Sequence, residues 1–581
     1  MESDFILDLQ RKRSNYSHPD QATSQANSLV LLSSGIYTEE ERFVFELLQN
    51  AVDAHNSNTS CLDVKIMLED DYLIFMHNGE AFTERDIEGL CDVGNGNKMN
   101  DVKKIGYKGI GFKSVFMRSN NVTVQSGGYC FKFDKNHWNN YWDLHWNKSE
   151  YGERDSEKKY SMPWQIIPIE TNPPLEVDVN GYNVITFIQL ARRGSIEQKI
   201  LRLFANNQFL LFLKSDNIKM SFSVDGVLRQ QIEKVKDGSK AILFSNGVES
   251  SKWLLHINDK VEVPSSLKDA INADINTPDK LKNANTFDLS FAIALDNNQL
   301  RRLSKEESLI FTYLPTSYRF GAEGFPFLVN ANFITDAGRQ QLHKDSEWNK
   351  LIFSRIPSEY LTWMKQLSTD YKNYWEVLPE KSYGNGNPIE QIYEDNMKKA
   401  IDEIAFIPCF HDPAQKVLAS DAFMDRIGIS DAISVKSLVG HINRTYSLSY
   451  QEEALVENVW RGSKILSSYG VFIFDKQKIH NLFEDNSVFE NISISMDIKL
   501  LDFLYAYYLR NHSEQDELKG ILNGTRFLFN EHLELNSPGE LFYPSSYKDQ
   551  NKLADGVNML NQDIYDTIQS RPELIAWLSS L

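Results

Sequence analysis

The chain has 581 residues, of which 41% are hydrophobic and 12% aromatic, so it has enough apolar side chains for several buried cores. Its formal net charge of −19 disfavours a general nucleic-acid binder, which needs a basic face, although local basic patches stay open. There is no apolar run that could span a bilayer, residues 1–34 lack a secretory leader, and the four cysteines have no disulfide or metal spacing. We therefore expect a multidomain protein of the cytoplasm, without a membrane partner.

The polar N-terminal segment, residues 1–35, carries a basic run at 11–13 and a stretch rich in Ser, Gln and Asn at 14–28. Two interpretations are open for this segment. It either crosses to a second subunit when nucleotide is bound, as the resemblance described below implies, or is disordered or a simple helical lead-in to the first domain.

The next segment predicts a helix in which Glu46, Asn50 and Asp53 share one face, because they stand at i, i+4 and i+7. The opposite stripe is apolar and consists of Phe43, Leu47, Leu48 and Ala51. A helix that only shows polar residues to water has a similar pattern. The residue types favour chemistry instead, since a carboxylate can polarise a water and an amide oxygen one turn later can join a magnesium shell with phosphate oxygens.

Two strands, at 61–68 and 72–76, are predicted after this helix, with an acidic turn between them. Thr83 then caps a further helix, with Asp86 three residues on. Residues 92–101 contain too much Gly and Asn for a regular element.

A glycine-rich loop follows, in which Gly106, Gly109 and Gly111 precede a predicted helix start. Glycine lets another group approach the main chain closely, and free N–H groups at a helix start attract anions. Lysines surround the loop in the sequence, at positions 98, 103, 104, 108 and 113. The loop therefore favours a polyphosphate ligand, although glycine spacing of this kind is a weak signal by itself.

Together these stretches resemble the motifs of the GHKL ATPases, a superfamily that includes gyrase, the heat-shock protein 90 chaperones, histidine kinases and MutL. Residues 46–54 match the N-box Glu-x-x-x-Asn-x-x-Asp-Ala, and residues 106–114 match the glycine box Gly-x-x-Gly-x-Gly-Phe-x-Ser. The glycine box looks most like that of the sacsin-type branch, a relative of the heat-shock chaperones. The resemblance implies an α+β protein whose ATP-binding domain, at 36–192, is a Bergerat-type α/β sandwich with an antiparallel or mixed sheet and helices on one face.

The middle motif departs from the superfamily pattern, which is Asp-x-Gly-x-Gly. His77 stands where the family has the aspartate that contacts adenine, and Ala81 replaces the second glycine. Asn78 offers an acceptor and donors, so we predict that Asn78, next to Gly79, contacts adenine, while His77 stays the alternative.

The resemblance also implies roles for individual residues. Glu46 activates the attacking water, Asn50 holds Mg²⁺, Asp53 organises the adenine side, and the glycine box cradles the phosphates of ATP. Lys98 lies in the predicted ATP lid, either as a nucleotide contact or as a solvated lysine. The predicted nucleotide-binding residues besides Glu46 are Asn50, Asp53, Asn78, Gly79, Lys98, Gly106, Gly109, Ile110, Gly111, Phe112, Lys113 and Ser114.

Beyond the glycine box, a hairpin at 122–125 and 129–133 and a last strand at 184–190 complete the predicted ATP-binding domain. Residues 193–370 predict an α/β unit similar in position to the transducer or middle domain of the relatives. Its strands are predicted at 217–224, 240–245, 252–257, 287–294, 309–314 and 325–333. Within it, Arg339 is the candidate that reaches the γ-phosphate, as a middle-domain arginine does in the heat-shock chaperones, and a surface salt bridge is the alternative.

The C-terminal region, 371–581, predicts a mixed, mainly helical fold without repeats. Helices are predicted at 388–405, 450–468 and 496–510, with a short β turn-back at 407–417. Pro572 interrupts any single helix near the end of the sequence.

The function that this reading predicts is Mg²⁺-dependent ATP hydrolysis that drives a chaperone-like or remodelling clamp on protein clients or partner subunits, with a nucleotide-dependent homodimer as a further expectation. One alternative is a nucleotide-gated sensor or anti-phage defence component in which ATP binding controls assembly. A DNA-repair ATPase of the MutL type is the less favoured alternative, because the chain is acidic.

Overall fold

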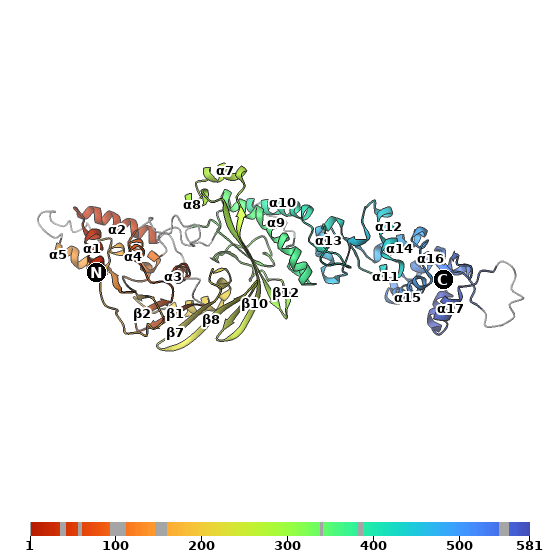
Figure 1. The fold of residues 1–581 in the computed structure, drawn as a ribbon, viewed down its shortest axis with the longest axis horizontal. Helices are drawn as coiled ribbons and strands as arrows, with labels where there is room; N and C mark the ends of the chain where they lie inside the picture. Colours follow the sequence, from red (N-terminus) through yellow and green to blue (C-terminus); the bar gives the residue numbers. More distant parts are fainter. Residues whose placement is uncertain are drawn as a thin grey trace. The chain divides into compact units, whose positions relative to one another are not determined.

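The computed structural model describes most of the chain and divides it into two compact units (Figure 1). The described residues are 2–34, 42–55, 61–92, 112–145, 160–336, 341–380, 387–544 and 557–581. The first unit comprises Met1–Ile356 and Ser382–Tyr393, and the second comprises Pro357–Lys381 and Glu394–Leu581. The predicted ATP-binding domain lies wholly in the first unit, together with most of the predicted middle domain.

The first unit is built on one mixed sheet of 15 strands, which agrees with the predicted α+β class. Along the sheet the order is β14-β13-β15-β11-β10-β9-β8-β7-β1-β2-β6-β3-β4-β5, and β12 pairs with β11. The strands are β1 (Leu62–Glu69), β2 (Tyr72–His77), β3 (Asn121–Ser126), β4 (Tyr129–Asp134), β5 (Ile169–Glu170), β6 (Val184–Gln189), β7 (Ile218–Val224), β8 (Val227–Asp237), β9 (Lys240–Ser245), β10 (Val248–Glu262), β11 (Thr286–Asp296), β12 (Gln299–Arg301), β13 (Ile310–Thr312), β14 (Leu314–Pro315) and β15 (Leu328–Ala331).

The strands predicted for the ATP-binding domain are confirmed, and the local residue pattern explains them. Along β1, buried residues alternate with half-buried ones, as period-2 patterning requires. Its turn into β2 contains Asp70 with a φ of +48°, and the turn between β3 and β4 contains Gly127 with a φ of +58°. Both turns use residue types that tolerate the left-handed region.

A parallel pairing between β1 and β7 joins the predicted ATP-binding domain to the predicted middle domain. The register runs from Leu62 opposite Ile218 to Leu68 opposite Val224. The two predicted domains therefore share one continuous sheet within the first unit. Strand β8, which was not predicted, extends this sheet beside β7.

Helices cover parts of this sheet, and the N-terminal segment forms two helices, at Glu2–Ser14 and Pro19–Ser34, rather than being disordered. Ile6 and Leu9 of the first helix are buried in the core of this unit, and Thr83 and Asp86 form the predicted capping box of α4. Among the described helices, none combines the length and apolarity needed to span a bilayer. The helices and 3₁₀ turns are α1 (Glu2–Ser14), α2 (Pro19–Ser34), α3 (Arg42–Asp53), α4 (Glu84–Leu90), η1 (Phe112–Met117), α5 (Lys135–His145), η3 (Trp164–Ile166), α6 (Ile196–Ala205), η4 (Asn207–Phe212), η5 (Ser265–Leu267), α7 (Lys268–Ala273) and α8 (Asp279–Lys282).

The second unit is mainly helical, as predicted, with three small sheets. Helices α9 and α10 each carry residues of both units. Helices and turns are α9 (Glu347–Asp370), η6 (Tyr374–Val377), α10 (Pro388–Glu403), η7 (Ala419–Asp421), α11 (Ser430–Ile433), α12 (Val435–Tyr446), η8 (Glu452–Ala454), η9 (Trp460–Gly462), α13 (Ser463–Tyr469), η10 (Lys476–Lys478), α14 (Ile479–Glu484), η11 (Asn486–Val488), α15 (Ile494–Arg510), η12 (His512–Glu514), α16 (Gln515–Gly524), η13 (Pro538–Glu540), α17 (Gln562–Ile568) and α18 (Pro572–Leu578). Strands are β16 (Ile407–Pro408), β17 (Lys416–Val417), β18 (Phe423–Asp425), β19 (Leu455–Val456), β20 (Phe472–Phe474), β21 (Leu528–Phe529) and β22 (Leu535–Asn536).

One predicted helix of this unit, at 450–468, is wrong over residues 450–462. That part contains η8, β19 and η9, and the helix α13 begins only at Ser463. Leu455 and Val456 are buried because β19 pairs in parallel with β18, so their apolar character serves a sheet and not a helical face. Pro572 instead acts as predicted, since it separates α17 from α18 and stands at the first position of α18, where its missing N–H is not needed.

A buried acid lies inside the second unit. Asp497 on α15 is fully buried, and its Oδ2 accepts a hydrogen bond from the main-chain N–H of Phe529 at 3.0 Å. Its Oδ1 has no hydrogen-bond partner. Burial raises the pKa of Asp497 to about 8, because the charged form is poorly solvated there.

The raised pKa of Asp497 predicts that the free energy of unfolding of the second unit falls as pH rises. The folded state keeps the Asp497 proton up to about pH 8, whereas the unfolded chain releases it near the ordinary aspartate pKa of about 3.9, so unfolding is favoured increasingly between these values. Asp497→Asn should raise the melting temperature at pH 8 and flatten its decline from pH 5 to pH 8 in calorimetry. Asp516→Asn, at an exposed acid on α16, is the control. An unchanged slope in Asp497→Asn would refute this assignment.

Candidate functional site

The acid on the polar face of α3 is enclosed, whereas Asn50 and Asp53 on the same face are half-buried. Glu46 is only 6% exposed and Gln49 only 3%, while the opposite apolar stripe is buried as predicted. The helix packs against both β1 and η1. The alternative of a simple solvent-exposed polar face is therefore excluded for Glu46.

The end of α3 is held against the motif that follows β2. The main-chain N–H of Glu80 donates to the carbonyl of Ala54 at 2.7 Å. A Cβ on Gly79 would lie 3.0 Å from the Ala54 oxygen and 2.9 Å from His77 Nδ1, so only glycine allows this close approach. The structure thus brings together two of the three sequence motifs, the N-box helix and residues 77–79.

Within that motif, Asn78 is already bonded to the main chain at the start of β1. Its Oδ1 accepts from the N–H of Asp63 at 2.9 Å, and its Nδ2 donates to the carbonyl of Cys61 at 3.0 Å. His77 is buried, and its Nδ1 accepts from the N–H of Gly79 at 3.2 Å. An adenine contact by Asn78 stays a prediction, and it would use the second Nδ2 hydrogen or the second Oδ1 lone pair.

The described end of the glycine box forms η1, which contains Phe112, Lys113 and Ser114. The Lys113 ammonium group is buried, donates to the carbonyls of Leu90 and Gln165, and lies over the rings of Phe116 and Phe133.

Burial lowers the pKa of Lys113 to about 8. Its side chain ties η1 to α4 and η3. A phosphate contact by residue 113 would therefore come from the main-chain N–H group.

Six predicted site residues lie outside the described residues. They are Lys98, Gly106, Gly109, Ile110, Gly111 and Arg339. Their roles stay predictions.

The sequence analysis missed a tyrosine close to the end of α3. The hydroxyl of Tyr313 donates to Asp288 Oδ2 at 2.6 Å, and its N–H donates to Asn330 Oδ1 at 2.6 Å. Burial raises the pKa of Tyr313 strongly, and the carboxylates of Asp288 and Asp53 raise it further. The φ of Tyr313 is +64°, a conformation that costs a residue other than glycine about 1–3 kcal/mol.

This arrangement puts Asp53, on the N-box helix, within electrostatic range of the segment between β13 and β14. A single tyrosine between two short strands carries no sequence signal, so its proximity to Asp53 could not be predicted.

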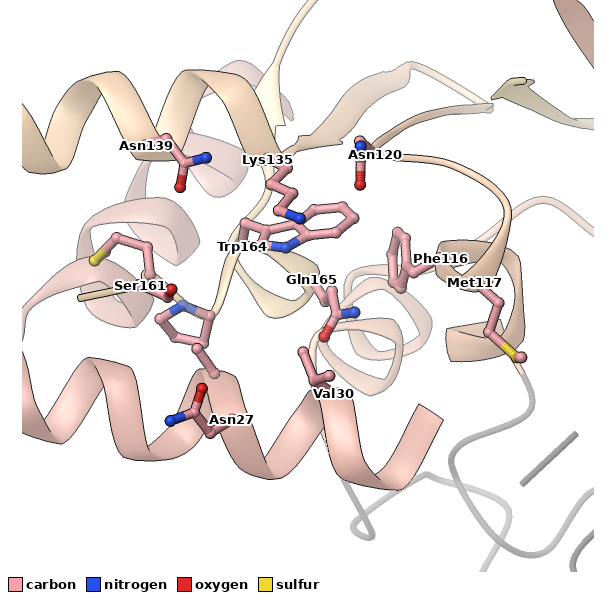
Figure 2. A pocket seen from close by; sticks show the side chains of 13 residues that line it. Asn27, Val30, Phe116, Met117, Asn120, Lys135, Asn139, Ser161, Trp164 and Gln165 are labelled. Carbon is pink, nitrogen blue, oxygen red and sulfur yellow. The ribbon is translucent and has the colours of Figure 1, made fainter. Parts of the chain in front are cut away.

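A cavity of about 370 Å³ lies beside the second half of η1 (Figure 2). Phe116 and Met117 of η1 line it together with Trp164, whose ring meets that of Phe116 edge-on at 5.0 Å. Its polar lining groups are Asn27, Asn120, Lys135, Asn139, Ser161 and Gln165. The described lining includes none of the predicted site residues.

Comparison with known proteins supports the sacsin-type resemblance. Residues 32–187 match the family model of the Sacsin domain. The chain is 25% identical over 402 residues to Protein NO VEIN of Arabidopsis thaliana, a match covering 65% of this chain and 13% of the plant protein. It is 28% identical over 261 residues to Sacsin of Homo sapiens, covering 40% of this chain and 5% of the human protein. The chain thus spans only a small part of either relative.

These similarities support a sacsin-like family for this chain, with the Sacsin-domain match at residues 32–187, a range that includes every predicted site residue except Arg339.

Proposed function

We propose that the first unit binds ATP with Mg²⁺ at the polar face of α3 and hydrolyses it to drive a chaperone-like or remodelling clamp on protein partners. The observation that carries this proposal is the enclosed Glu46 carboxylate, 6% exposed, on the same helix face as Asn50. The match to the Sacsin domain over residues 32–187 supports it.

The chemistry of these side chains fits a magnesium-bound triphosphate. The amide oxygen of Asn50 is a hard ligand of the kind that Mg²⁺ accepts, and Mg²⁺ usually completes its shell with waters and phosphate oxygens. When bound, Mg²⁺ would neutralise charge on the phosphates. Glu46, one turn before Asn50, would orient or deprotonate the attacking water.

A purely structural role explains Glu46 less well. Moving a carboxylate out of water is costly even when it has a partner, so a helix with only a packing role would favour an apolar residue at this position.

The other predicted residues complete the proposed site. Main-chain N–H groups of residues 109–114 would receive the phosphates, and Asp53 and Asn78 would serve the adenine side. Lid closure over 92–105 and arrival of Arg339 at the γ-phosphate would couple ATP to the geometry of the clamp.

The shared sheet offers a route for that coupling within the first unit. Strand β1, against which α3 packs, pairs with β7 of the middle region, and Tyr313 lies in electrostatic range of Asp53. A nucleotide that moves α3 would therefore disturb contacts of the middle region directly. We propose a nucleotide-dependent homodimer in the cytoplasm as the working form, with protein clients as its substrates.

The first test is Glu46→Gln, which keeps the side-chain shape and removes the base. We expect ATP binding to persist and hydrolysis to fall by about 100-fold or more, as loss of a general base does. Calorimetry would measure binding, and phosphate release would measure turnover. Glu84→Gln, at an exposed acid on α4, should behave as the wild type. Wild-type turnover in Glu46→Gln would show that its assigned role is wrong.

The second test is Asn50→Ala, which removes the proposed magnesium ligand. The wild type should bind ATP more tightly with Mg²⁺ than with EDTA, and the variant should lose most of this difference because one oxygen ligand is missing. Titration calorimetry in both buffers would measure it. Asn180→Ala, at an exposed asparagine of the same unit, is the control.

A full magnesium effect in Asn50→Ala would contradict the ligand assignment. If the wild type binds Mg-ATP but shows no turnover, the nucleotide-gated sensor becomes the better function.

A further inference from the structure

The second unit contains a pocket of about 860 Å³ in which basic and aromatic side chains meet. Its basic lining residues are Arg426, Arg461, Lys464 and Lys478, and its aromatic ones are Tyr450, Trp460 and Phe472. Among the described lining residues, the only acid is Asp475. The pocket is thus locally positive in a chain whose net charge is −19, and the sequence analysis found no such patch outside the glycine-rich loop.

A small parallel sheet supports the pocket. Its strand order is β19-β18-β20, and both pairings are parallel. Arg426 follows β18, Asp475 follows β20, and β19 leads to Trp460, so these residues come from the carboxyl ends of the three strands. In open parallel sheets this edge is where ligands bind.

Two contacts hold the loops of the pocket in place. Asn458 Nδ2 donates to the carbonyl of Arg426 at 3.0 Å, which links the segments after β19 and β18. Gly462 packs so closely on Trp375 that an added Cβ would lie 2.5 Å from the indole ring. The segment that carries Trp460 is therefore fixed by its neighbours.

Trp460 presents a stacking surface. The Arg426 guanidinium carbon lies 3.8 Å from the centre of the Trp460 ring, so one face of the indole is covered by a cation. Trp460 is nevertheless 68% exposed, which leaves the other face accessible. Arg426 as a whole is half-buried; its Nε is buried and, among the described residues, has no hydrogen-bond partner.

The positive charges around this ring are largely uncompensated. Within the described residues, Arg461 and Lys464 are exposed and have no ion pair. Lys478 pairs with Asp475 at 3.1 Å and lies over the ring of Phe472. The pocket therefore offers several donors for an anion next to an aromatic face.

We propose that this pocket binds a nucleotide unit, with its base on the free face of Trp460 and its phosphate at Lys464, Arg461 and Arg426. An aromatic platform beside a basic groove is the arrangement by which proteins hold single-stranded nucleic acid and nucleotides without strong sequence preference. An acidic peptide would satisfy the cations but would leave the exposed indole face unused. The unit is either a free nucleotide or part of a single strand, and this site is distinct from the polar face of α3.

The test uses the full chain and a fluorescein-labelled deoxythymidine 12-mer in fluorescence anisotropy, with unlabelled AMP as competitor. Trp460→Ala and Lys464→Glu should each weaken binding by about 10-fold or more, because a stacked base and a phosphate contact are lost. Two matched controls lie elsewhere in the same unit: Phe542→Ala, at a residue 61% exposed, and Lys436→Glu, at an exposed lysine of α12.

The outcomes distinguish a free nucleotide from a single strand as the ligand, and this pocket from the proposed ATP site at α3. Oligonucleotide binding that depends on Trp460 and Lys464 supports a single-strand site, and AMP binding alone with the same dependence supports a free nucleotide. Trp460→Ala and Lys464→Glu should leave Mg-ATP hydrolysis unchanged, so failure at α3 and failure here are distinguishable. The proposal is overturned if the controls weaken binding as much as the two variants, if neither probe binds, or if only an acidic peptide binds.

Discussion

The structure of the first unit depends on the close approach between the end of α3 and Gly79. Because glycine has no Cβ, the main chain after β2 reaches the Ala54 carbonyl, and the Glu80 N–H completes the contact at 2.7 Å. This contact links the helix that carries Glu46 and Asn50 to the main chain just after β2, an inner strand of the large sheet. A larger residue at position 79 would push these two elements apart and would change the surroundings of the polar face of α3.

The second consequence of the fold is that one sheet runs continuously through the first unit. The parallel pairing of β1 with β7 makes one sheet out of two regions that the sequence analysis treated as separate domains. The proposed ATP site and the middle region therefore lie on the same sheet, so no separate chain of contacts is needed to connect them. Tyr313, whose φ is +64°, lies within electrostatic range of Asp53 on the N-box helix.

Local residue patterns predicted many of the helices and strands, whereas pairings between strands far apart in the sequence were not predictable from such patterns. Alternation predicted β1 and β2, and the shared face of α3 predicted its enclosed acid. Nothing in the sequence pattern indicated that β1 pairs with β7, more than 100 residues away. Nor did the pattern indicate that the ammonium group of Lys113 is buried. The false helix over residues 450–462 has the same origin, because a parallel partner decided the structure of β19.

The central claim is that Mg-ATP binds against the polar face of α3, and hydrogen–deuterium exchange of the full chain tests it most directly. With saturating Mg-ATP, the main-chain amides of α3 and of residues 77–80 should exchange more slowly than in the free chain, because a ligand that binds the folded state suppresses local opening. Unchanged exchange in both segments, while calorimetry shows that ATP binds, would contradict the account.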